Sequence, residues 1–572
     1  MKRSIYIACI TGGFILATAS SASVQAQNTQ QKDTTVNRTV VVEQEYNPNI
    51  LDASKVNVLP KVEEPTVSKK DVEYATTFFP ATSIPAGLMR PYVGREVQPD
   101  GKFGYVRAGY GNYGNLDLLG NYLFQLSDQD KLNVRFQMDG SDGKLEMLDG
   151  ALDWNRYYYR TRANVDFTHQ FDKVNLNIAA NFGLSNFNFS ALQIGKQKFT
   201  SGDLHVGVSS TDESAPIKFE AETNLMIFNR QNNNTSIFGD AIGETQIHTK
   251  GEISGAISEE QSIHIGLDMR NLFYNKDLVL PEGGGKVYEN RTALGLNPYY
   301  KLGNDNWNLH AGAHVDFSLG SGKSLRVSPD VMAQYIFSDS YVLYAQATGG
   351  KLVNDFRRLE MISPYGLPGS RINDTYEQLN ATLGFKTSPY PGLWFNIYGG
   401  YQKLKDDLYE SSLYIIDNAD PLAMTSLTDR TTVKSYLDLP SENTNNFYAG
   451  IKLSYDYKDI ISVSTAFTYR DWDANDKKAL IMKPNSEVNL NVDFRPVTGL
   501  NMSVGYDYIG RTKVNDIRVA EVSDLHLGAS YNLFKDVSVY ARVNNILNKD
   551  YQYYLDYPTE GVNFLGGLSF RF

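Results

Sequence analysis

Hydrophobic and polar residues alternate with a period of two over long stretches of this chain. Three stretches show the pattern most clearly, because apolar side chains occupy every second position of 174–184, 307–319 and 525–533. Successive side chains of a strand point to opposite faces of a sheet, so each stretch predicts a strand with one apolar and one polar face. Globular strands average about five or six residues, whereas a strand that crosses a bilayer at a tilt needs about 9–11. The lengths therefore favour strands that cross a membrane.

Short turn sequences recur between these stretches and set the expected topology. The clearest turns lie at 128–130, 171–173, 211–214, 258–260, 303–305, 338–340, 388–391, 457–459, 495–498 and 534–536. Two strands and one usually longer connection separate successive tight turns, which is the asymmetry of outer-membrane barrels with short periplasmic turns and longer extracellular loops. The count predicts an all-β fold, a transmembrane antiparallel β-barrel of about 22 strands over residues 101–572. An even number of strands places both ends of the barrel in the periplasm.

The longest outer loops are expected at 349–371 and 403–443. Loops of this length without structure of their own are uncommon unless they have a function. The second loop is rich in acidic and aromatic residues. It can fold over or into the lumen, or form a solvated cap at the cell surface, and both alternatives stay open.

The end of the chain predicts one lipid-facing strand. One face of this strand carries Phe564, Leu568, Phe570 and Phe572, and the other carries Asn563, Ser569 and Arg571. The apolar face resembles the insertion signal of Gram-negative outer-membrane barrels, which implies the barrel-assembly machinery, outer-membrane lipid and lipopolysaccharide as partners. A terminal strand of a soluble β-sandwich is the alternative, since it too can be amphipathic.

The N-terminus has the features of a secretory signal peptide over residues 1–26. Lys2 and Arg3 precede an apolar stretch at 5–19, and Val24-Gln25-Ala26 resembles a cleavage site. The apolar stretch is too short for a permanent spanning helix. The single cysteine, Cys9, lies inside this signal, so we expect no disulfide and no cysteine-based metal site in the mature chain.

Composition narrows the class of protein further. The chain has 54 Lys and Arg against 65 Asp and Glu, a net charge of −11, which argues against a nucleic-acid partner. The 38 Tyr, 28 Phe and 46 Gly suit a barrel that is apolar outside, polar inside and ringed by aromatic side chains. A secreted array of β-sandwiches is the competing interpretation of the composition.

Two stretches carry a resemblance to the TonB-dependent receptors. The segment 545–551, followed by Tyr557-Pro558 and Gly561, resembles the last hairpin of these receptors. The segment 356–358 and the strand that begins near Tyr376 resemble their mid-barrel loop and the strand after it. The resemblance implies a 22-stranded outer-membrane barrel and a role in solute uptake.

The resemblance fails at the N-terminus. Receptors of this family carry a plug domain that fills the barrel, whereas residues 27–100 leave too few positions for a full plug. This periplasmic segment holds seven of the 20 prolines and favours extended structure. Within it Thr39, Val40, Val41 and Val42 faintly resemble a TonB box, which pairs with TonB by edge addition, and residues 33–36 do so as well. A plain β-edge in a periplasmic tail is the alternative.

No motif supports catalysis or a cofactor. The G-x-G-x-x-G sequence at 109–114 joins two predicted strands instead of a strand and a helix, and 322–324 reads as a hairpin turn and not a P-loop. The calcium-like run 471–476 lacks the glycine and the glutamate of a calcium loop. His310 and His314 share a strand face but are about 13 Å apart at 3.3 Å per residue, so we expect them to line the lumen without sharing a metal. We therefore expect no catalytic, cofactor-binding or metal site, and no enzyme.

The leading functional hypothesis is a receptor-type barrel for solute uptake across the outer membrane. A barrel of this width is an open hole unless something fills it. We expect inward-folded loops, the proline-rich segment or a partner protein to occlude the lumen. Two alternatives remain: a plugless, non-transporting scaffold or accessory subunit of an outer-membrane complex, and a passive porin. TonB, or another periplasmic or surface protein, is the expected protein partner.

Overall fold

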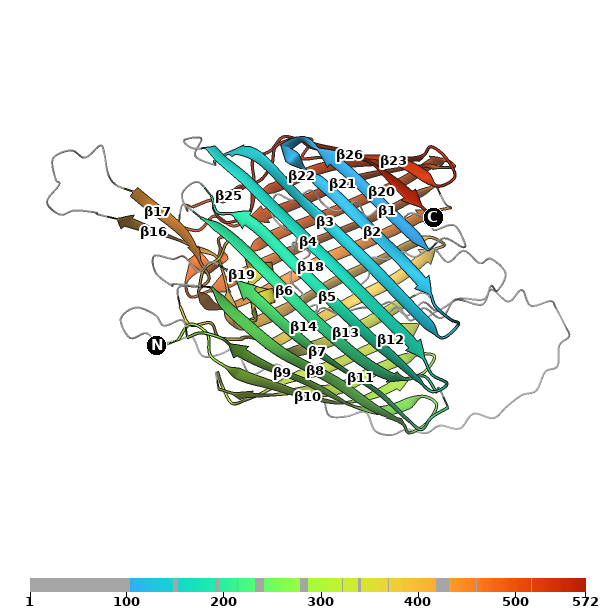
Figure 1. Cartoon of the computed structure of the whole chain (residues 1–572). Helices are drawn as coiled ribbons and strands as arrows, with labels where there is room; N and C mark the ends of the chain where they lie inside the picture. The colour runs from blue at the N-terminus through green and yellow to red at the C-terminus, as the bar shows by residue number, and fades with distance from the viewer. Residues whose placement is uncertain are drawn as a thin grey trace, which may run out of the picture. The chain divides into compact units, whose positions relative to one another are not determined.

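The described part of the chain forms one 22-stranded antiparallel sheet that closes on itself (Figure 1). The fold is known from a computed structural model. It describes residues 103–147, 153–190, 195–212, 214–231, 241–277, 286–320, 322–337, 341–368, 370–417, 432–458, 460–515 and 517–572, and the side chains of 413–417 and 432–436 are not described. The predicted fold class, a closed antiparallel barrel of 22 strands, is confirmed. The predicted signal peptide at 1–26 and the predicted periplasmic segment at 27–100 lie outside the described residues.

The barrel strands follow one another in chain order. They are β1 (Gly104–Gly111), β2 (Leu116–Gln125), β3 (Asp130–Glu146), β4 (Asp153–Gln170), β5 (Val174–Asn188), β6 (Lys196–Ser210), β7 (Ile217–Arg230), β8 (Ile242–Ala256), β9 (Gln261–Tyr274), β10 (Arg291–Gly303), β11 (Trp307–Leu319), β12 (Leu325–Phe337), β13 (Tyr341–Leu352), β14 (Thr375–Tyr390), β15 (Leu393–Leu408), β18 (Ser441–Tyr457), β19 (Ile461–Ala474), β20 (Pro484–Val497), β21 (Leu500–Arg511), β22 (Val522–Asn532), β23 (Val537–Asn544) and β26 (Asn563–Arg571).

Short elements lie in the connections. They are the hairpin of β16 (Ser411–Asp417) and β17 (Thr432–Asp438), the hairpin of β24 (Gln552–Tyr554) and β25 (Tyr557–Pro558), the helix α1 (Phe356–Ile362), and the 3-10 turns η1 (Asn112–Gly114) and η3 (Lys477–Leu480). No helix among the described residues is long and apolar enough to cross a membrane.

The seam between the first and last strands closes the barrel. β1 pairs with β26 in antiparallel register, with Ala108 opposite Leu568 and Gly109 opposite Gly567. The two glycines allow the backbones to approach closely, because a Cβ at Gly567 would lie 2.2 Å from the carbonyl oxygen of Ala108. Closure leaves the 22-stranded sheet without an edge strand, as a bilayer requires.

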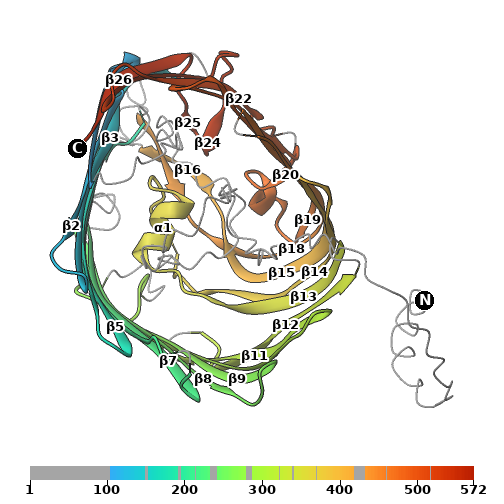
Figure 2. The same ribbon diagram turned by 90° about the vertical axis from the view of Figure 1, so that its right-hand side faces the viewer.

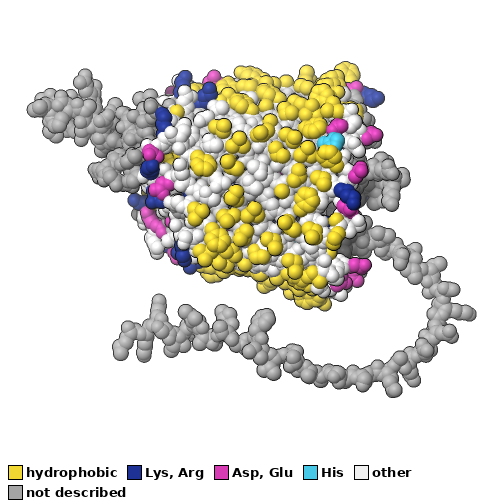
Figure 3. All heavy atoms as spheres, turned by 60° about the horizontal axis from the view of Figure 1, so that its bottom comes forward, with side chains coloured by type: hydrophobic (Ala, Val, Ile, Leu, Met, Phe, Trp, Pro, Cys, Tyr) yellow, Lys and Arg dark blue, Asp and Glu magenta, His cyan; other side chains and the backbone are white. Residues whose placement is uncertain are grey.

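The outer surface of the barrel is apolar between two charged rims. Figure 3 shows hydrophobic side chains over the middle of one face, with Lys, Arg, Asp and Glu toward the two ends. The predicted insertion residues lie on this surface, where Phe564, Leu568, Phe570 and Phe572 are 45–56% exposed and point away from buried Ser569. The apolar side chains of β26 therefore face outward and the polar ones inward, as the sequence pattern predicted.

The two ends of the barrel differ. We call one the turn end, because it carries the tight turns, the start of β1 and the end of β26. We call the other the loop end, because it carries the long connections. A row of outward-facing aromatic rings lies along the turn end. The ring centroids of Trp307 and Tyr335 are 4.7 Å apart, and those of Phe337 and Tyr341 are 5.6 Å apart. Such belts of amphipathic rings mark the interface between acyl chains and water.

Three predicted boundaries differ from the structure. β15 continues to Leu408 and β13 to Leu352, so both long loops begin later than expected, and β14 continues to Tyr390, which moves the tight turn to 391–392. The strands extend beyond the apolar belt, where both faces are polar and the period-two signal disappears. At the new turn Gly392 adopts a φ of +82°, a conformation that favours glycine.

Candidate functional site: the cap at the loop end

The connections at the loop end fold inward and share one hydrophobic core, which we call the cap. Its buried side chains come from most of these connections and from the adjoining ends of barrel strands, so the core is built by residues far apart in the chain. They are Leu145, Met147, Trp154, Tyr158, Phe187, Phe189, Phe199, Phe228, Ile242, Val287, Tyr288, Phe356, Leu359, Tyr365, Leu367, Ile372, Leu408, Leu437, Leu439, Ala474, Ala479, Leu480, Ile481, Val514, Val519, Tyr554, Leu555 and Tyr557. The loops fold inward as expected, and occlusion of the lumen by them stays a prediction.

Helix α1 lies inside the ring of strands (Figure 2). The Asp355 side chain accepts a hydrogen bond from the Arg358 backbone N–H at 2.8 Å, which caps the first turn. The helix ends at Ile362, and the next residue, Ser363, has the extended backbone that is favoured before Pro364. Phe356 and Leu359 lie one turn apart on one face and are buried in the cap.

Polar contacts join α1 to a distant part of the barrel wall. Ser185 Oγ on β5 donates to Glu360 Oε1 at 2.9 Å, and Arg357 forms an ion pair with Asp203 of β6 at 3.2 Å. Helix α1 follows β13, which lies several strands away from β5 and β6 in the closed ladder. The connection between β13 and β14 therefore crosses the lumen.

Tyr365 is the centre of the aromatic part of the cap. Its ring stacks on Tyr557 with centroids 3.6 Å apart, and it meets Trp154 and Phe187 edge-on at 6.3 and 5.2 Å. Aromatic pairs of this kind contribute about 0.5–1.5 kcal/mol each beyond their buried area. Two connections that are distant in sequence, and the loop-end parts of β4 and β5, meet at this one ring.

A buried polar group holds the base of α1. Arg291 forms an ion pair with Asp374 at 3.0 Å and donates to the carbonyl oxygen of Asn354 at 3.0 Å. Glu244 accepts from the Phe356 backbone N–H at 3.2 Å and from Tyr274 Oη at 2.8 Å. These contacts fix the segments on both sides of the helix to β8, β9 and β10.

A second buried carboxyl group joins the loop after β15 to the last loop. Glu410 Oε2 accepts from the Leu555 backbone N–H at 3.0 Å. Burial raises the pKa of Glu410 to about 7, against an ordinary value of 4.5, although hydrogen bonds from Ser363 and Leu555 act the other way. Burial likewise lowers the pKa of Arg358 to about 10. Burial in the cap therefore destabilises the charged forms of Glu410 and Arg358.

The resemblance at the last hairpin has a clear structural cause in Asn545. This residue has a φ of +48°, which asparagine tolerates better than most residues. Its side-chain amide donates to the carbonyl oxygens of Lys549 and Glu560, both at 2.9 Å. The Glu560 carboxylate in turn forms a buried ion pair with Arg156 at 3.1 Å. The motif thus folds the last loop against the wall.

The wall below the cap is polar, as expected of a lumen. The His264 ring stacks on Tyr299 at 4.5 Å and Tyr299 stacks on His310 at 4.3 Å. His310 lies 2.7 Å from Asp330 and His314 lies 3.9 Å from the same carboxylate. The two histidines face the lumen as predicted, and they share a carboxylate.

The other sequence motifs occupy the places that the pattern predicted. Residues 109–114 run from β1 through η1 toward β2, and 322–324 join β11 to β12. The calcium-like run 471–476 ends β19, where Asp476 caps η3. Thr39, Val40, Val41 and Val42 lie outside the described residues, so a TonB contact there stays a prediction. The cap core was not predicted residue by residue, although the aromatic residues of the long loops were a signal for it.

Comparison with solved structures supports the resemblance at the level of the fold. The FrpB iron transporter from Neisseria meningitidis matches with a TM-score of 0.63 at 10% identity, covering 83% of this chain and 82% of that one. A mutant of the ferric enterobactin receptor PfeA from Pseudomonas aeruginosa, in complex with enterobactin, matches with 0.61 at 12%, covering 83% and 82%. The fold is that of the TonB-dependent receptors. The copper transporter OprC matches with 0.58 at 14%, covering 84% of each chain. No family model and no curated protein matches the chain.

Proposed function

We propose that this protein is an outer-membrane receptor-type barrel that takes up a solute, and that the cap is the closed state of its outer gate. The observation that carries the proposal is the cap itself, a hydrophobic core in which the inward-folded loops pack on one another and on the ends of the barrel strands. A solute receptor needs a barrier that keeps the wide barrel from leaking, and the cap supplies one. Solved structures of the same fold include an iron transporter and a copper transporter, which supports an uptake role.

The proposal excludes a passive porin, which needs a permanently open lumen. In a porin the loop end stays wet, whereas here α1 crosses the lumen with Phe356 and Leu359 buried at 2% and 1% exposure. Opening the gate requires α1 and the last loop to separate at Tyr365 and Tyr557.

Energy for opening comes, in this proposal, from TonB in the periplasm. Thr39, Val40, Val41 and Val42 are the proposed contact, as a strand added to an edge of TonB. We also propose that Phe564, Leu568, Phe570 and Phe572 direct insertion by the barrel-assembly machinery. The barrel would then lie among outer-membrane lipid and lipopolysaccharide with its N-terminus in the periplasm.

The gate is tested by conductance of the purified protein in planar bilayers. We expect a low conductance for the full-length protein, the same low conductance after deletion of residues 27–100, and open channels after deletion of residues 355–372. Open channels after the first deletion alone would show that the N-terminal segment, and not the cap, seals the barrel. High conductance of the full-length protein would overturn the gate and support the porin.

Coupling is tested by co-purification with TonB. Proline at position 41 removes a backbone donor from the proposed added strand, so Val41→Pro should abolish co-purification. Val36→Pro changes the other faint match and serves as the matched control. Retention of TonB by both variants would overturn the proposed contact.

A second candidate function is a closed scaffold for other envelope proteins. Buried ion pairs inside the cap favour it, since Arg156–Glu560 and Arg291–Asp374 are costly to break. A scaffold predicts that a large partner co-purifies and that the barrel never opens, whether or not TonB is present.

A further inference from the structure

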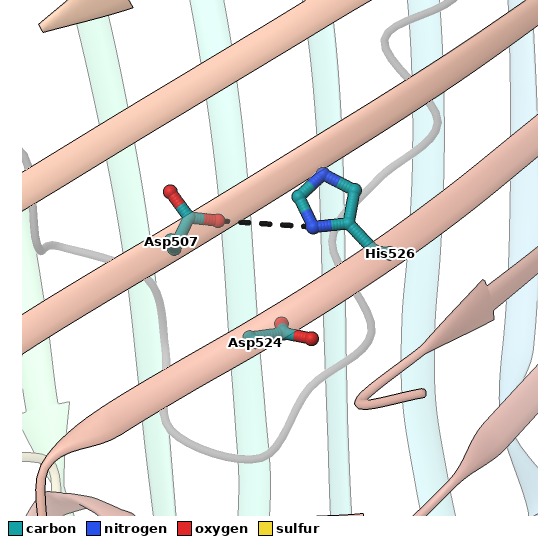
Figure 4. A group of neighbouring side chains, drawn as sticks. All are labelled: Asp507, Asp524 and His526. Atoms are coloured by element: carbon teal, nitrogen blue, oxygen red, sulfur yellow. Dashed lines mark ion pairs between the residues drawn. The ribbon is translucent and has the colours of Figure 1, made fainter. Parts of the chain in front are cut away.

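Three side chains that commonly bind metal ions lie together in the barrel wall, near the loop end of β21 and β22 (Figure 4). They are Asp507 on β21 and Asp524 and His526 on β22. One ligand atom of each, a carboxylate oxygen or an imidazole nitrogen, lies within 4.8 Å of the other two. All three residues are buried, at 7%, 5% and 8% exposure. Sequence motifs predicted no metal site. They could not predict this group, because its members come together only through the pairing of two strands.

The strand register brings the three side chains together. Asp507 pairs directly with Asp524, and Gly505 pairs with His526, so all three point to the lumen side of the same strand pair. Gly505 is what lets the imidazole lie over β21, because a Cβ at this position would be only 2.0 Å from His526 Nε2. The ring is thereby placed beside Asp507, with His526 Nδ1 3.8 Å from Asp507 Oδ2.

The two carboxylates need positive charge. Like charges directly opposite each other on adjacent strands are destabilising, and burial increases the cost. Asp524 forms no ion pair with a Lys or Arg among the described residues, and His526 supplies at most one positive charge against two carboxylates. A divalent cation bound between Asp507 and Asp524 would reduce the repulsion between their carboxylates.

Neighbouring donors already orient both carboxylates. Asp507 Oδ1 accepts from the Asn489 side-chain amide at 2.5 Å, and Asp524 Oδ1 accepts from the Asn545 backbone N–H at 2.7 Å. Hydrogen bonds of this kind to the ligating groups are typical of protein metal sites. The second bond also ties the group to the last loop of the cap through Asn545.

We propose that Asp507, Asp524 and His526 bind one divalent transition-metal ion. One imidazole nitrogen and two carboxylate oxygens, without a thiolate, suit Zn²⁺, Fe²⁺ or Co²⁺ better than a soft ion such as Cu⁺. Three protein ligands leave a further position for water. The bound ion would join β21 to β22 just below the last loop, and the site does not depend on the proposed uptake function.

The test uses full-length protein purified in detergent without a polyhistidine tag and stripped of metal with EDTA. Co²⁺ is then titrated and followed by its visible absorption, and Zn²⁺ is titrated by calorimetry. We expect one equivalent of each ion to bind. Asp524→Asn and His526→Gln should weaken binding at least about tenfold, whereas the matched lumen variants Asp330→Asn and His310→Gln should leave it unchanged.

Two further variants test the geometry without removing a ligand. Gly505→Ala should displace the imidazole and weaken binding. Asn489→Ala should weaken binding about 10–100-fold, because it removes the hydrogen bond that orients the Asp507 carboxylate. They also keep the proposal testable if a ligand variant does not fold.

Resistance to heat gives an independent readout. Zn²⁺ should raise the temperature at which the wild-type barrel unfolds, as any ligand of the native state does. Metal-free Asp524→Asn should be more resistant than the metal-free wild type, because the carboxylate repulsion is gone, and Zn²⁺ should not stabilise it further. Absence of binding by the wild type, unchanged binding by Asp524→Asn, or loss of binding in the Asp330→Asn control would each overturn the proposal.

Discussion

Buried ion pairs at the loop end should contribute more to the free energy of unfolding than exposed ones do. Arg291 and Asp374 are 3% and 9% exposed at their side chains, whereas the ion pair of Arg371 with Glu289 is 44% and 28% exposed. A buried charge that loses its partner cannot recover its hydration, while an exposed one can. The two pairs therefore allow a direct comparison within the same loop region.

Arg291→Met should lower the free energy of unfolding by about 3–5 kcal/mol, because Asp374 is left buried without its counter-charge. Arg371→Met should change it by about 1 kcal/mol or less. Urea denaturation of the detergent-solubilised barrel, followed by tryptophan fluorescence, measures both. Equal effects of the two substitutions would contradict the role assigned to the buried pair.

Glu410 should make the cap less stable as the pH rises. Its pKa of about 7 in the fold lies above the ordinary 4.5, so the fold holds the proton more tightly than the unfolded chain does. The free energy of unfolding should fall between about pH 4.5 and 7 and then stay level. The full difference corresponds to about 3 kcal/mol.

Glu410→Gln tests this pH dependence, because the amide oxygen can still accept from Leu555 but does not ionise. The difference in stability between wild type and variant, measured by urea denaturation at pH 5 and pH 8, should change sharply over this interval. A constant difference would mean that Glu410 does not titrate in the predicted range.

At the scale of elements, α1 owes its position to packing more than to helical propensity. A seven-residue helix is too short to be stable alone. Phe356 and Leu359 face the cap, while Met361 on the same helix is 46% exposed. The strands illustrate the opposite case: their long alternating patterns specify both their position and the face that meets lipid.

Leu359→Ala should loosen α1 by about 2–5 kcal/mol through the cavity it leaves, and should produce brief openings in planar-bilayer recordings. Met361→Ala should leave the current unchanged, since its side chain is largely outside the core. Identical recordings for Leu359→Ala and the wild type would mean that α1 does not limit conduction.

At the scale of the whole molecule, closure of the sheet distinguishes a membrane barrel from a row of sandwiches. The first and last strands are separated by the entire described chain and yet pair along their length. The outer face of the seam contains Ala108 and Leu568 as direct partners. The only native cysteine is Cys9, in the predicted signal peptide, so the variants are compared with a Cys9→Ser background and introduced cysteines give an unambiguous readout.

The double variant Ala108→Cys/Leu568→Cys should cross-link with a short bismaleimide, and the product should migrate differently in a denaturing gel. Ala449→Cys/Leu568→Cys is the control, because Ala449 is also outward-facing but lies on β18, many strands from β26. Failure of the first pair to cross-link in protein that the gel shows to be folded would contradict closure.

The sequence alone was sufficient for the properties that depend on local alternation. The stretches 174–184 and 307–319 are strands β5 and β11, and the pattern at the chain's end correctly separates Phe570 from Ser569. Strand number followed from the spacing of turns, because each hairpin is a local event. Boundaries were less accurate where strands leave the bilayer and the apolar face ends.

Only the tertiary structure revealed the cap and the group at Asp507, Asp524 and His526. Tyr365 and Tyr557 are separated by most of the second half of the barrel, and no local period relates them. Asp507 and Asp524 meet because two strands pair in one register, and a shift by one residue would place them on opposite faces. Alternation acts within a strand and can be read along the chain, whereas contacts across the lumen depend on how the closed barrel brings distant loops together.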